Sequence, residues 1–176
     1  YTLGMQGPSI AFDTACSASL SAYQAALYAL QHQDADQYQS TSQAIDAALV
    51  FGVNVMTDSG TSLLFTAAGM TSPSGKSHTF DVRANGYARG EACSCVVFLL
   101  DLREEEVPRV RCDAGAVRQD GKRKSLTARN GTAQQALSRA ALMSAGRAPH
   151  GAWMIEARGT GNRHGDTVAA EARAAV

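Results

Sequence analysis

The alternation of apolar and polar positions predicts a strand that leads directly into a helix near the start of the chain. The apolar segment 9–12, "SIAF", has the length of a short strand. Beyond it, apolar side chains recur at spacings of three and four residues, at Leu20, Tyr23, Leu27 and Leu30. This spacing places them on one face of an amphipathic helix. The polar segment Gln31–Gln43 has no such periodicity, so we expect an exposed loop there.

Further apolar runs alternate with helical patterns along the rest of the chain. The runs that we expect to form strands are 44–52, 93–100, 107–112 and 152–157. Pro73 and Gly75 mark a turn between the first two of these runs. The charged segment 101–106 is expected to cross the surface and lead into a second half of the chain. Strands that alternate with helices predict an α/β fold with an at least partly parallel sheet.

Capping signals predict where two later helices begin and end. Thr132 and Gln135 have the spacing of a capping box, and the helix that they begin is expected to end at Gly146. Asp166 is expected to cap the final helix, because a carboxylate at a helix start accepts hydrogen bonds from unpaired backbone N–H groups.

Charge and composition exclude several functional classes. The chain of 176 residues carries 16 Lys and Arg against 16 Asp and Glu, and it is 45% hydrophobic. This is the composition of a globular domain, and the balanced charge offers no net field that attracts nucleic acid or an anionic membrane. No apolar run approaches the roughly 20 residues that span a bilayer. We therefore expect neither nucleic-acid binding nor a membrane span.

The ends of the chain and its cysteines bear on where the protein works. The sequence begins at Tyr1 and stops within a helical pattern, so we expect an excerpt of a longer protein, whose targeting segment is not observable here. The four cysteines, at positions 16, 93, 95 and 112, match neither a disulfide framework nor a zinc site. Their scatter favours a reducing compartment, which is the cytoplasm or an organellar stroma.

The cysteines divide into candidates for structure and for chemistry. Cys93 and Cys95 are two residues apart in an expected strand, so both face the same side as small apolar residues. Cys16, in "DTACSAS", is expected in the first turn of a helix, where unpaired N–H groups favour the thiolate. Position alone also fits a small buried residue at a strand-to-helix junction, and free cysteines are usually of that kind. Both interpretations of Cys16 are open on position alone.

Five blocks in order resemble one family. The segment "GPSIAFDTACSASLSAYQAAL" at 7–27 resembles the active-site segment of the β-ketoacyl synthases, the condensing enzymes of polyketide and fatty acid biosynthesis. Four further blocks follow in the family's order: "GVNVM" at 52–56, "SPSGKSHTFDVRANGYARGE" at 72–91, "RQDGKRKSLTARNGTAQQ" at 118–135 and "IEARGTGNRHGD" at 155–166. The resemblance is strongest to the ketosynthase domains of modular type I polyketide synthases.

The resemblance implies an architecture. It implies the thiolase-like fold, in which two related α/β halves stack as α/β/α/β/α layers, and a homodimer. Residues 1–102 then correspond to the later part of the N-terminal half, which carries the nucleophile. Residues 107–176 correspond to the beginning of the C-terminal half. On this basis the chain covers part of both halves and is a partial domain.

The resemblance also implies an acyltransferase chemistry centred on Cys16. Its thiol takes an acyl group from a phosphopantetheine thioester, and the acyl group then undergoes decarboxylative condensation with a malonyl thioester. The backbone N–H of Cys16 resembles one of the two oxyanion donors. Thr160 matches a threonine that contacts the pantetheine arm, and Asn162 stands where the family has a second. No metal or resident cofactor is implied, because an acyl carrier protein or domain supplies the phosphopantetheine.

Arg158 departs from the family pattern. It occupies the position of a histidine that polarises the malonyl carbonyl and favours loss of carbon dioxide. A guanidinium group keeps its proton, is larger than an imidazole and does not act as a base. It offers electrostatic stabilisation of an enolate, with a different geometry. The substitution therefore concerns condensation more directly than loading of Cys16.

A second block of charged residues is expected to brace the site. Asp81, Arg89 and Glu91 fit the family segment that ends in G-Y-x-R-G-E. We expect them to form internal ion pairs that fix a loop beside the active site, and to take no direct part in catalysis.

Three functions follow from these observations. The leading one is a condensing ketosynthase that loads acyl chains on Cys16. The second is a non-elongating domain that holds or transfers acyl chains, because Arg158 replaces the histidine. The third is a non-catalytic dimer partner of an active ketosynthase, against which the intact "DTACS" motif argues.

Overall fold

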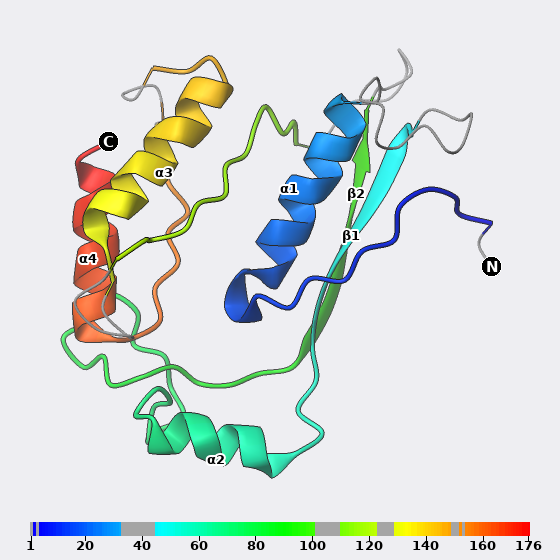
Figure 1. The fold of residues 1–176 in the computed structure, drawn as a ribbon. Coiled ribbons are helices and arrows are strands. Elements are labelled where there is room, and N and C mark those ends of the chain that lie inside the picture. The colour runs from blue at the N-terminus through cyan, green and yellow to red at the C-terminus, as the bar shows by residue number, and fades with distance from the viewer. Residues whose placement is uncertain are drawn as a thin grey trace. The chain divides into compact units, whose positions relative to one another are not determined.

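The order of helices and strands is that of an α/β protein. A computed structural model describes residues 2, 4–32, 45–100, 110–122, 129–148, 152 and 154–176. Its elements are η1 (Ala15–Ser17), α1 (Ala18–Gln31), β1 (Ala47–Asn54), α2 (Ser59–Ala67), β2 (Ala92–Leu99), α3 (Gly131–Ser144) and α4 (Arg163–Ala174) (Figure 1). Most of the segment expected to be a polar loop, and the whole crossover 101–106, lie outside the described residues.

The elements belong to two compact units that interleave in the sequence. The first unit combines Tyr1–Val53 with Ala92–Gly115, and the second combines Asn54–Glu91 with Ala116–Val176. The chain therefore passes between the units after residues 53, 91 and 115. The assignment of 1–102 and 107–176 to two halves of a larger fold stays a prediction.

In the first unit, β1 and β2 form an antiparallel pair. The Leu100 N–H donates to the Asp46 carbonyl, and the Ser94 hydroxyl donates to the Gly52 carbonyl. As the position on β1 rises, its partner on β2 falls, which is the antiparallel register. This described pair thus differs from the partly parallel sheet expected from the sequence. The strand β1 also continues two residues past its expected end at Gly52.

Helix α1 lies along this strand pair, as the apolar spacing predicts (Figure 1). Leu27 and Leu30 on the helix and Val50 on β1 are buried. Near the start of α1, the strand β1 approaches the helix closely because Gly52 of β1 has no side chain. A Cβ on Gly52 would lie 3.3 Å from the Ser19 Cβ. A side chain at this position would therefore push the first turn of α1 away from the strand.

Tyr23 anchors the middle of α1 to the same unit. Its ring lies 5.2 Å from the Phe98 ring on β2, and its hydroxyl donates to the Ala114 carbonyl at 3.3 Å. Burial raises the pKa of Tyr23 to about 12, and the neighbouring Cys112 side chain contributes in the same direction. The neutral phenol is thus the form that the folded unit stabilises.

The raised pKa of Tyr23 predicts a loss of stability at alkaline pH. The Tyr23 phenol loses its proton near pH 10 in the unfolded chain and near pH 12 in the folded unit. Its contribution to the free energy of unfolding is therefore complete below about pH 10 and disappears as the pH rises towards about 12. We expect the variant Tyr23→Phe to lose less stability than the parent protein across this interval. Urea unfolding midpoints of both proteins at about pH 9 and about pH 11 measure the difference. Parallel decreases in the two proteins would contradict the assignment.

In the second unit, α3 and α4 pack against each other (Figure 1). Ala169 and Ala172 of α4 are buried, and their small side chains let the two helices approach closely. The Arg139 guanidinium of α3 donates to the Ala175 carbonyl at 3.0 Å, just after α4 ends. The shorter helix α2 is capped by Asp58, whose carboxylate accepts the Gly60 N–H at 2.7 Å.

The N-terminal caps of α3 and α4 differ from those expected. Asn130 caps α3 by accepting the Ala133 N–H, and Asn162 caps α4 by accepting the Gly165 N–H. In each helix the asparagine directly precedes the first helical residue, which is the position from which a short side chain reaches the third N–H. Thr132 and Asp166 lie too far into their helices to do so. The expected capping box and the Asp166 cap are therefore wrong.

The predicted end of α3 is confirmed. Gly146 has a φ of 64° and donates to the Met143 carbonyl, while the Arg147 N–H reaches back to the Leu142 carbonyl. These two hydrogen bonds form a Schellman motif, which satisfies the last carbonyls of the helix. The glycine is needed because its φ is positive.

Three expected strands are absent from the described residues. Segment 9–12 and the described parts of 107–112 and 152–157 have extended or irregular backbone without strand pairing. Their sequences favour strands, but a strand needs a hydrogen-bonded neighbour, and in the described chain β1 and β2 pair only with each other. The strand expected at 93–100 is confirmed as β2.

No helix among the described residues is long and apolar enough to cross a membrane.

Candidate active site

Cys16 occupies a short turn immediately before α1. It is the middle residue of η1, and Thr14 closes the turn by accepting the Ser17 N–H at 3.2 Å and the Ser17 hydroxyl at 2.9 Å. Ala15 has a φ of 52°, a conformation that residues with a Cβ rarely adopt. Such backbone strain just before a nucleophile is common at active sites. The turn therefore presents the Cys16 side chain at the surface of the first unit.

Exposure alone does not single out Cys16. Cys93, Cys95 and Cys112 are also exposed, and none of the four cysteines forms a disulfide. Cys93 and Cys95, expected to face the same side of a strand as small apolar residues, lie two residues apart on β2 and are exposed there. In the described chain β2 pairs only with β1. What distinguishes Cys16 is its turn and its sequence motif.

The segment 158–162 lies in the second unit, where two glycines bring it against the 78–87 loop. The Gly86 N–H donates to the Gly161 carbonyl at 2.8 Å, and the Thr79 hydroxyl donates to the Gly159 carbonyl at 3.2 Å. A Cβ on Gly159 would overlap the Thr79 side chain and touch the Phe80 ring. The glycines of this motif are thus required for close approach between two segments distant in sequence.

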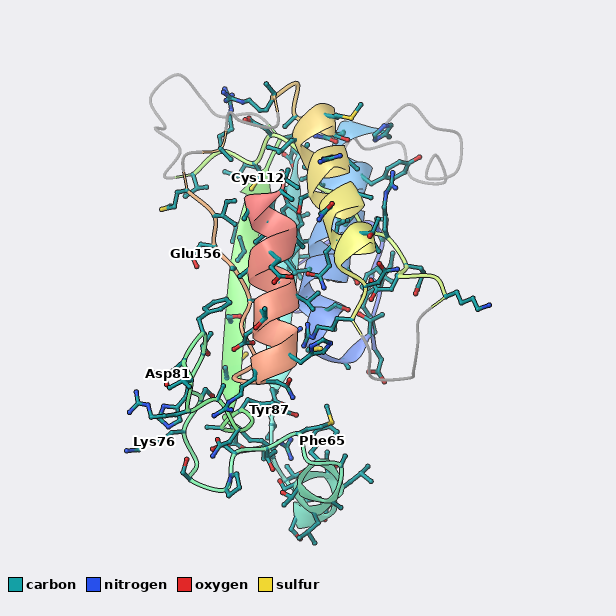
Figure 2. The ribbon with its side chains drawn as sticks, turned by 90° about the vertical axis from the view of Figure 1, so that its left-hand side faces the viewer. Phe65, Lys76, Asp81, Tyr87, Cys112 and Glu156 are labelled. Carbon is teal, nitrogen blue, oxygen red and sulfur yellow. The ribbon has the colours of Figure 1, made fainter. Side chains whose placement is uncertain are left out.

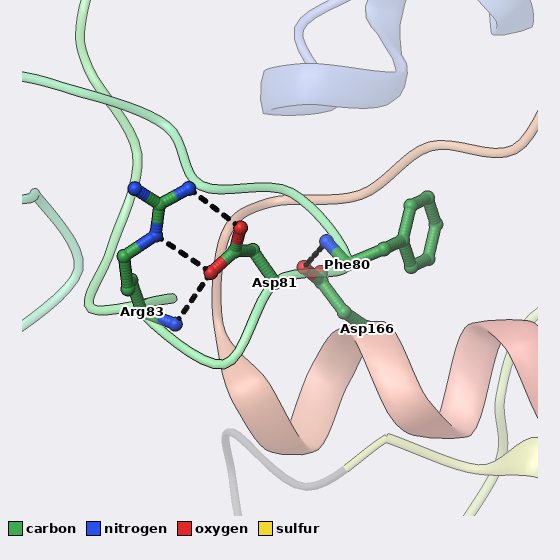
Figure 3. Close-up of polar contacts among 4 residues, drawn as sticks. All are labelled: Phe80, Asp81, Arg83 and Asp166. Atoms are coloured by element: carbon green, nitrogen blue, oxygen red, sulfur yellow. Dashed lines mark hydrogen bonds and ion pairs between the residues drawn. The ribbon is translucent and has the colours of Figure 1, made fainter.

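The carboxylate of Asp166 holds these two segments together. Asp166 is 4% exposed, and its two oxygens accept different backbone N–H groups. Oδ1 accepts the Thr160 N–H at 2.8 Å, and Oδ2 accepts the Phe80 N–H at 3.0 Å (Figure 3). Phe80 has a φ of 56°, so the carboxylate stabilises a residue in an unfavourable conformation.

The three predicted residues of segment 158–162 have different surroundings. Arg158 is exposed, and within the described chain its side chain has no hydrogen bond or ion pair. The Thr160 hydroxyl oxygen accepts a hydrogen bond from the Arg129 guanidinium at 3.3 Å. The side-chain oxygen of Asn162 is engaged in capping α4. Thr160 thus keeps a hydroxyl proton to donate, whereas Asn162 has its acceptor already in use.

The expected ion pairs of the 72–91 block are wrong. Asp81 pairs with Arg83 at 2.8 Å (Figure 3), and these hydrogen bonds from Arg83 hold the pKa of Asp81 below its usual range. Arg89 donates to the Ser62 hydroxyl, and Glu91 accepts the Met56 N–H. The charged groups of Asp81, Arg89 and Glu91 thus bind other partners in the described structure and do not pair with one another.

Arg89 nevertheless braces the loop, by a different contact. Its guanidinium lies 5.1 Å from the centre of the Phe65 ring on α2, within the range of a cation–π interaction. Thr71 and Tyr87 form an isolated parallel bridge in the same loop. Figure 2 shows Phe65 on α2 and Tyr87 on the loop beside it, with Lys76 and Asp81 directed outward.

Gly161 offers a test of the close approach between the two segments. Its φ is 66°, and a Cβ there would lie 2.5 Å from the Gly86 carbonyl oxygen, whereas Gly75, with a φ of 64°, has open space around it. Gly75→Ala should therefore cost about 1–2 kcal/mol from backbone strain alone. Gly161→Ala should cost at least about 3 kcal/mol, because the backbone must also move. Equal losses in urea unfolding would show that the segments are not tightly apposed.

Sequence reasoning missed the residues that organise this unit. The sequence pattern predicts Asp166 as a helix cap and indicates no role for Phe80 or Arg129. The adjacent Gly165 and Asp166 are the one sequence feature that indicates this role, since an acid beside a glycine in the first helical turn can approach a neighbouring backbone. The partner N–H of Phe80 is 86 positions away in the sequence, and no local pattern indicates it.

Comparison with protein families matches almost the whole chain, in two consecutive segments. The model of the β-ketoacyl synthase N-terminal domain matches residues 1–104, and that of the C-terminal domain matches residues 109–176. A highly reducing polyketide synthase of Aspergillus terreus is 37% identical over 175 residues, which are 98% of this chain and 6% of the relative. A phenolphthiocerol/phthiocerol polyketide synthase of Mycobacterium tuberculosis is 38% identical over 171 residues, which are 96% of this chain and 7% of the relative.

Solved structures give the same assignment. The ketosynthase from module 6 of the bacillaene synthase of Bacillus subtilis 168 superposes with a TM-score of 0.81 at 33% identity. An oxazolomycin ketosynthase domain of Streptomyces albus JA3453 gives a TM-score of 0.80 at 31% identity. Each comparison covers 97% of this chain and 30% of the solved chain. The chain thus spans a small part of its curated relatives and under a third of a solved ketosynthase. It has their thiolase-like α/β fold and belongs to the β-ketoacyl synthase family, among the ketosynthases of polyketide synthases.

Proposed function

We propose that this chain carries the acyl-accepting part of a ketosynthase, with Cys16 as the nucleophile. The observation that carries the proposal is the position of Cys16 in the family motif, exposed in a strained turn before α1. A cysteine that attacks a thioester must be accessible to it, and the thiolate is the reactive form.

The proposed reaction has two steps. The Cys16 sulfur forms a bond to the acyl carbon of a phosphopantetheine thioester, and the carbon–sulfur bond to pantetheine breaks to release its thiol. A malonyl thioester then loses carbon dioxide, and the resulting enolate attacks the acyl carbon. The bond to Cys16 breaks, which regenerates its thiolate and releases a 3-ketoacyl thioester. The Cys16 backbone N–H is proposed as one donor to the oxyanion in both steps.

The proposal extends to partners and location. An acyl carrier protein or domain delivers the acyl and malonyl groups on its phosphopantetheine arm, so the site needs no resident cofactor. The arm is proposed to meet Thr160, whose hydroxyl keeps a proton to donate. The complete domain is proposed to form a homodimer. Four free cysteines support a reducing compartment, which is the cytoplasm or an organellar stroma.

Arg158 favours a second candidate function. Its exposed side chain has a fixed positive charge where the family uses a histidine. In the second candidate the domain loads Cys16 but does not decarboxylate the malonyl group, and it only holds or transfers acyl chains. The two candidates share loading and differ in condensation.

Peptide mapping tests the shared step. The full-length protein is incubated with an acyl-pantetheine thioester, digested and examined for acylated cysteines. We expect the acyl group on Cys16 alone, with the equally exposed Cys93, Cys95 and Cys112 as internal controls. Acylation spread over all four cysteines, or none at all, would contradict both candidates and leave a non-catalytic dimer partner.

A further inference from the structure

The proposed arm-binding residue Thr160 is held from two sides. Asp166 Oδ1 accepts its backbone N–H at 2.8 Å, and the Arg129 guanidinium donates to its side-chain oxygen at 3.3 Å. With its N–H occupied, Thr160 has only its hydroxyl as a hydrogen-bond donor for a ligand. Because the hydroxyl oxygen already accepts from Arg129, the proton is directed elsewhere and is available to an acceptor.

Both holding residues approach a further part of the chain closely. Asp166 is buried and also accepts the N–H of the strained Phe80, so rotation of its carboxylate would break two hydrogen bonds together (Figure 3). Arg129 lies over the first turn of α4, where a Cβ on Gly165 would come within 2.7 Å of the Arg129 Nε. A glycine at position 165 therefore leaves the space that the arginine side chain occupies.

We infer that Asp166 and Arg129 are positioning residues that present the Thr160 hydroxyl as a donor to an amide carbonyl of the pantetheine arm. The inference rests on the proposed function, since it concerns how the arm is bound before Cys16 is acylated. Pantetheine contains amide carbonyls that accept such a hydrogen bond. Both residues act through the hydroxyl proposed to bind the arm, so their effect is expected in substrate binding and not in thiol reactivity.

Two variants of the full-length protein test the inference. In Asp166→Asn the amide offers one acceptor oxygen for two N–H groups, and its NH₂ faces a donor. In Arg129→Leu the Thr160 hydroxyl loses the hydrogen bond that Arg129 donates to it. Position 129 is exposed, so the substitution should affect folding little. Arg129→Lys keeps a donor at this position and is the matched control. Each protein is assayed for acylation by an acyl-pantetheine thioester and for alkylation of Cys16 by iodoacetamide, which has no pantetheine arm.

The expected result separates positioning from general stability. Asp166→Asn and Arg129→Leu should raise the KM for acylation about tenfold, the effect of one lost hydrogen bond. The limiting rate and the iodoacetamide rate should change by less than about twofold, and Arg129→Lys should stay close to the parent protein.

Two results would overturn the inference in distinguishable ways. If the parent protein is not acylated on Cys16, the proposed function fails and the inference with it. If the parent is acylated but Arg129→Leu leaves KM unchanged, or if acylation and alkylation fall equally in Asp166→Asn, the proposed function stands and the positioning roles are refuted.

Discussion

Replacing Cys16 by alanine is expected to abolish acyl transfer. The variant lacks the sulfur that forms the covalent intermediate. Among the described residues, no other cysteine lies in the turn and the family motif of Cys16, so none is expected to replace it. Loss of a nucleophile in other enzymes reduces the rate by several orders of magnitude, and we expect a decrease of at least about a thousandfold here. The rate of acyl-enzyme formation from an acyl-pantetheine thioester measures it directly.

The control for this variant is Cys112→Ala. Cys112 is also exposed, and it contacts Tyr23 away from the turn of η1. We expect its acylation rate to match that of the parent protein within about twofold. If Cys16→Ala retained acylation, or if Cys112→Ala lost it equally, the nucleophile would lie elsewhere in the protein.

Arg158→His is expected to accelerate condensation. An imidazole donates a hydrogen bond to the malonyl carbonyl and adjusts its protonation near neutral pH, whereas a guanidinium group keeps a fixed charge. Side chains that act in this way contribute about a hundredfold or more to a rate, so an increase on the order of a hundredfold is expected. Formation of 3-ketoacyl product from pre-acylated protein and malonyl-carrier protein is the measurement.

Loading provides the internal reference for the same variant. The Cys16 thiol, and not the side chain at position 158, forms the bond to the acyl carbon, so the rate of acylation should change by less than about threefold. If the parent protein condenses and Arg158→His is unchanged or slower, arginine serves the step as it stands. The condensing function would then hold without the histidine.

Local patterns in the sequence predicted the elements that are stabilised locally. The spacing of Leu27 and Leu30 predicted helix α1, the apolar run at 93–100 predicted β2, and Gly146 predicted the end of α3. In each case the deciding interaction is formed within a few residues or by a single buried face. The family motif around Cys16 also lies in one short segment.

The interactions that the sequence did not reveal join distant residues. The carboxylate of Asp166 binds an N–H that is 86 positions away, and Arg89 contacts Phe65 instead of the acids in its own block. The expected strand at 9–12 lacks a described partner, although its composition favours a strand. Composition and spacing describe a segment by itself, whereas strands and buried carboxylates depend on which segments meet in the fold.

The central claim is that Cys16 carries an acyl chain on its way to a 3-ketoacyl product. Intact-protein mass spectrometry of the full-length protein tests it most directly, first with an acyl-pantetheine thioester and then after addition of malonyl-carrier protein. We predict an acyl adduct that appears in the first step and is discharged as 3-ketoacyl-carrier protein in the second. An adduct that persists would establish the non-elongating domain, and the absence of any adduct would contradict the account.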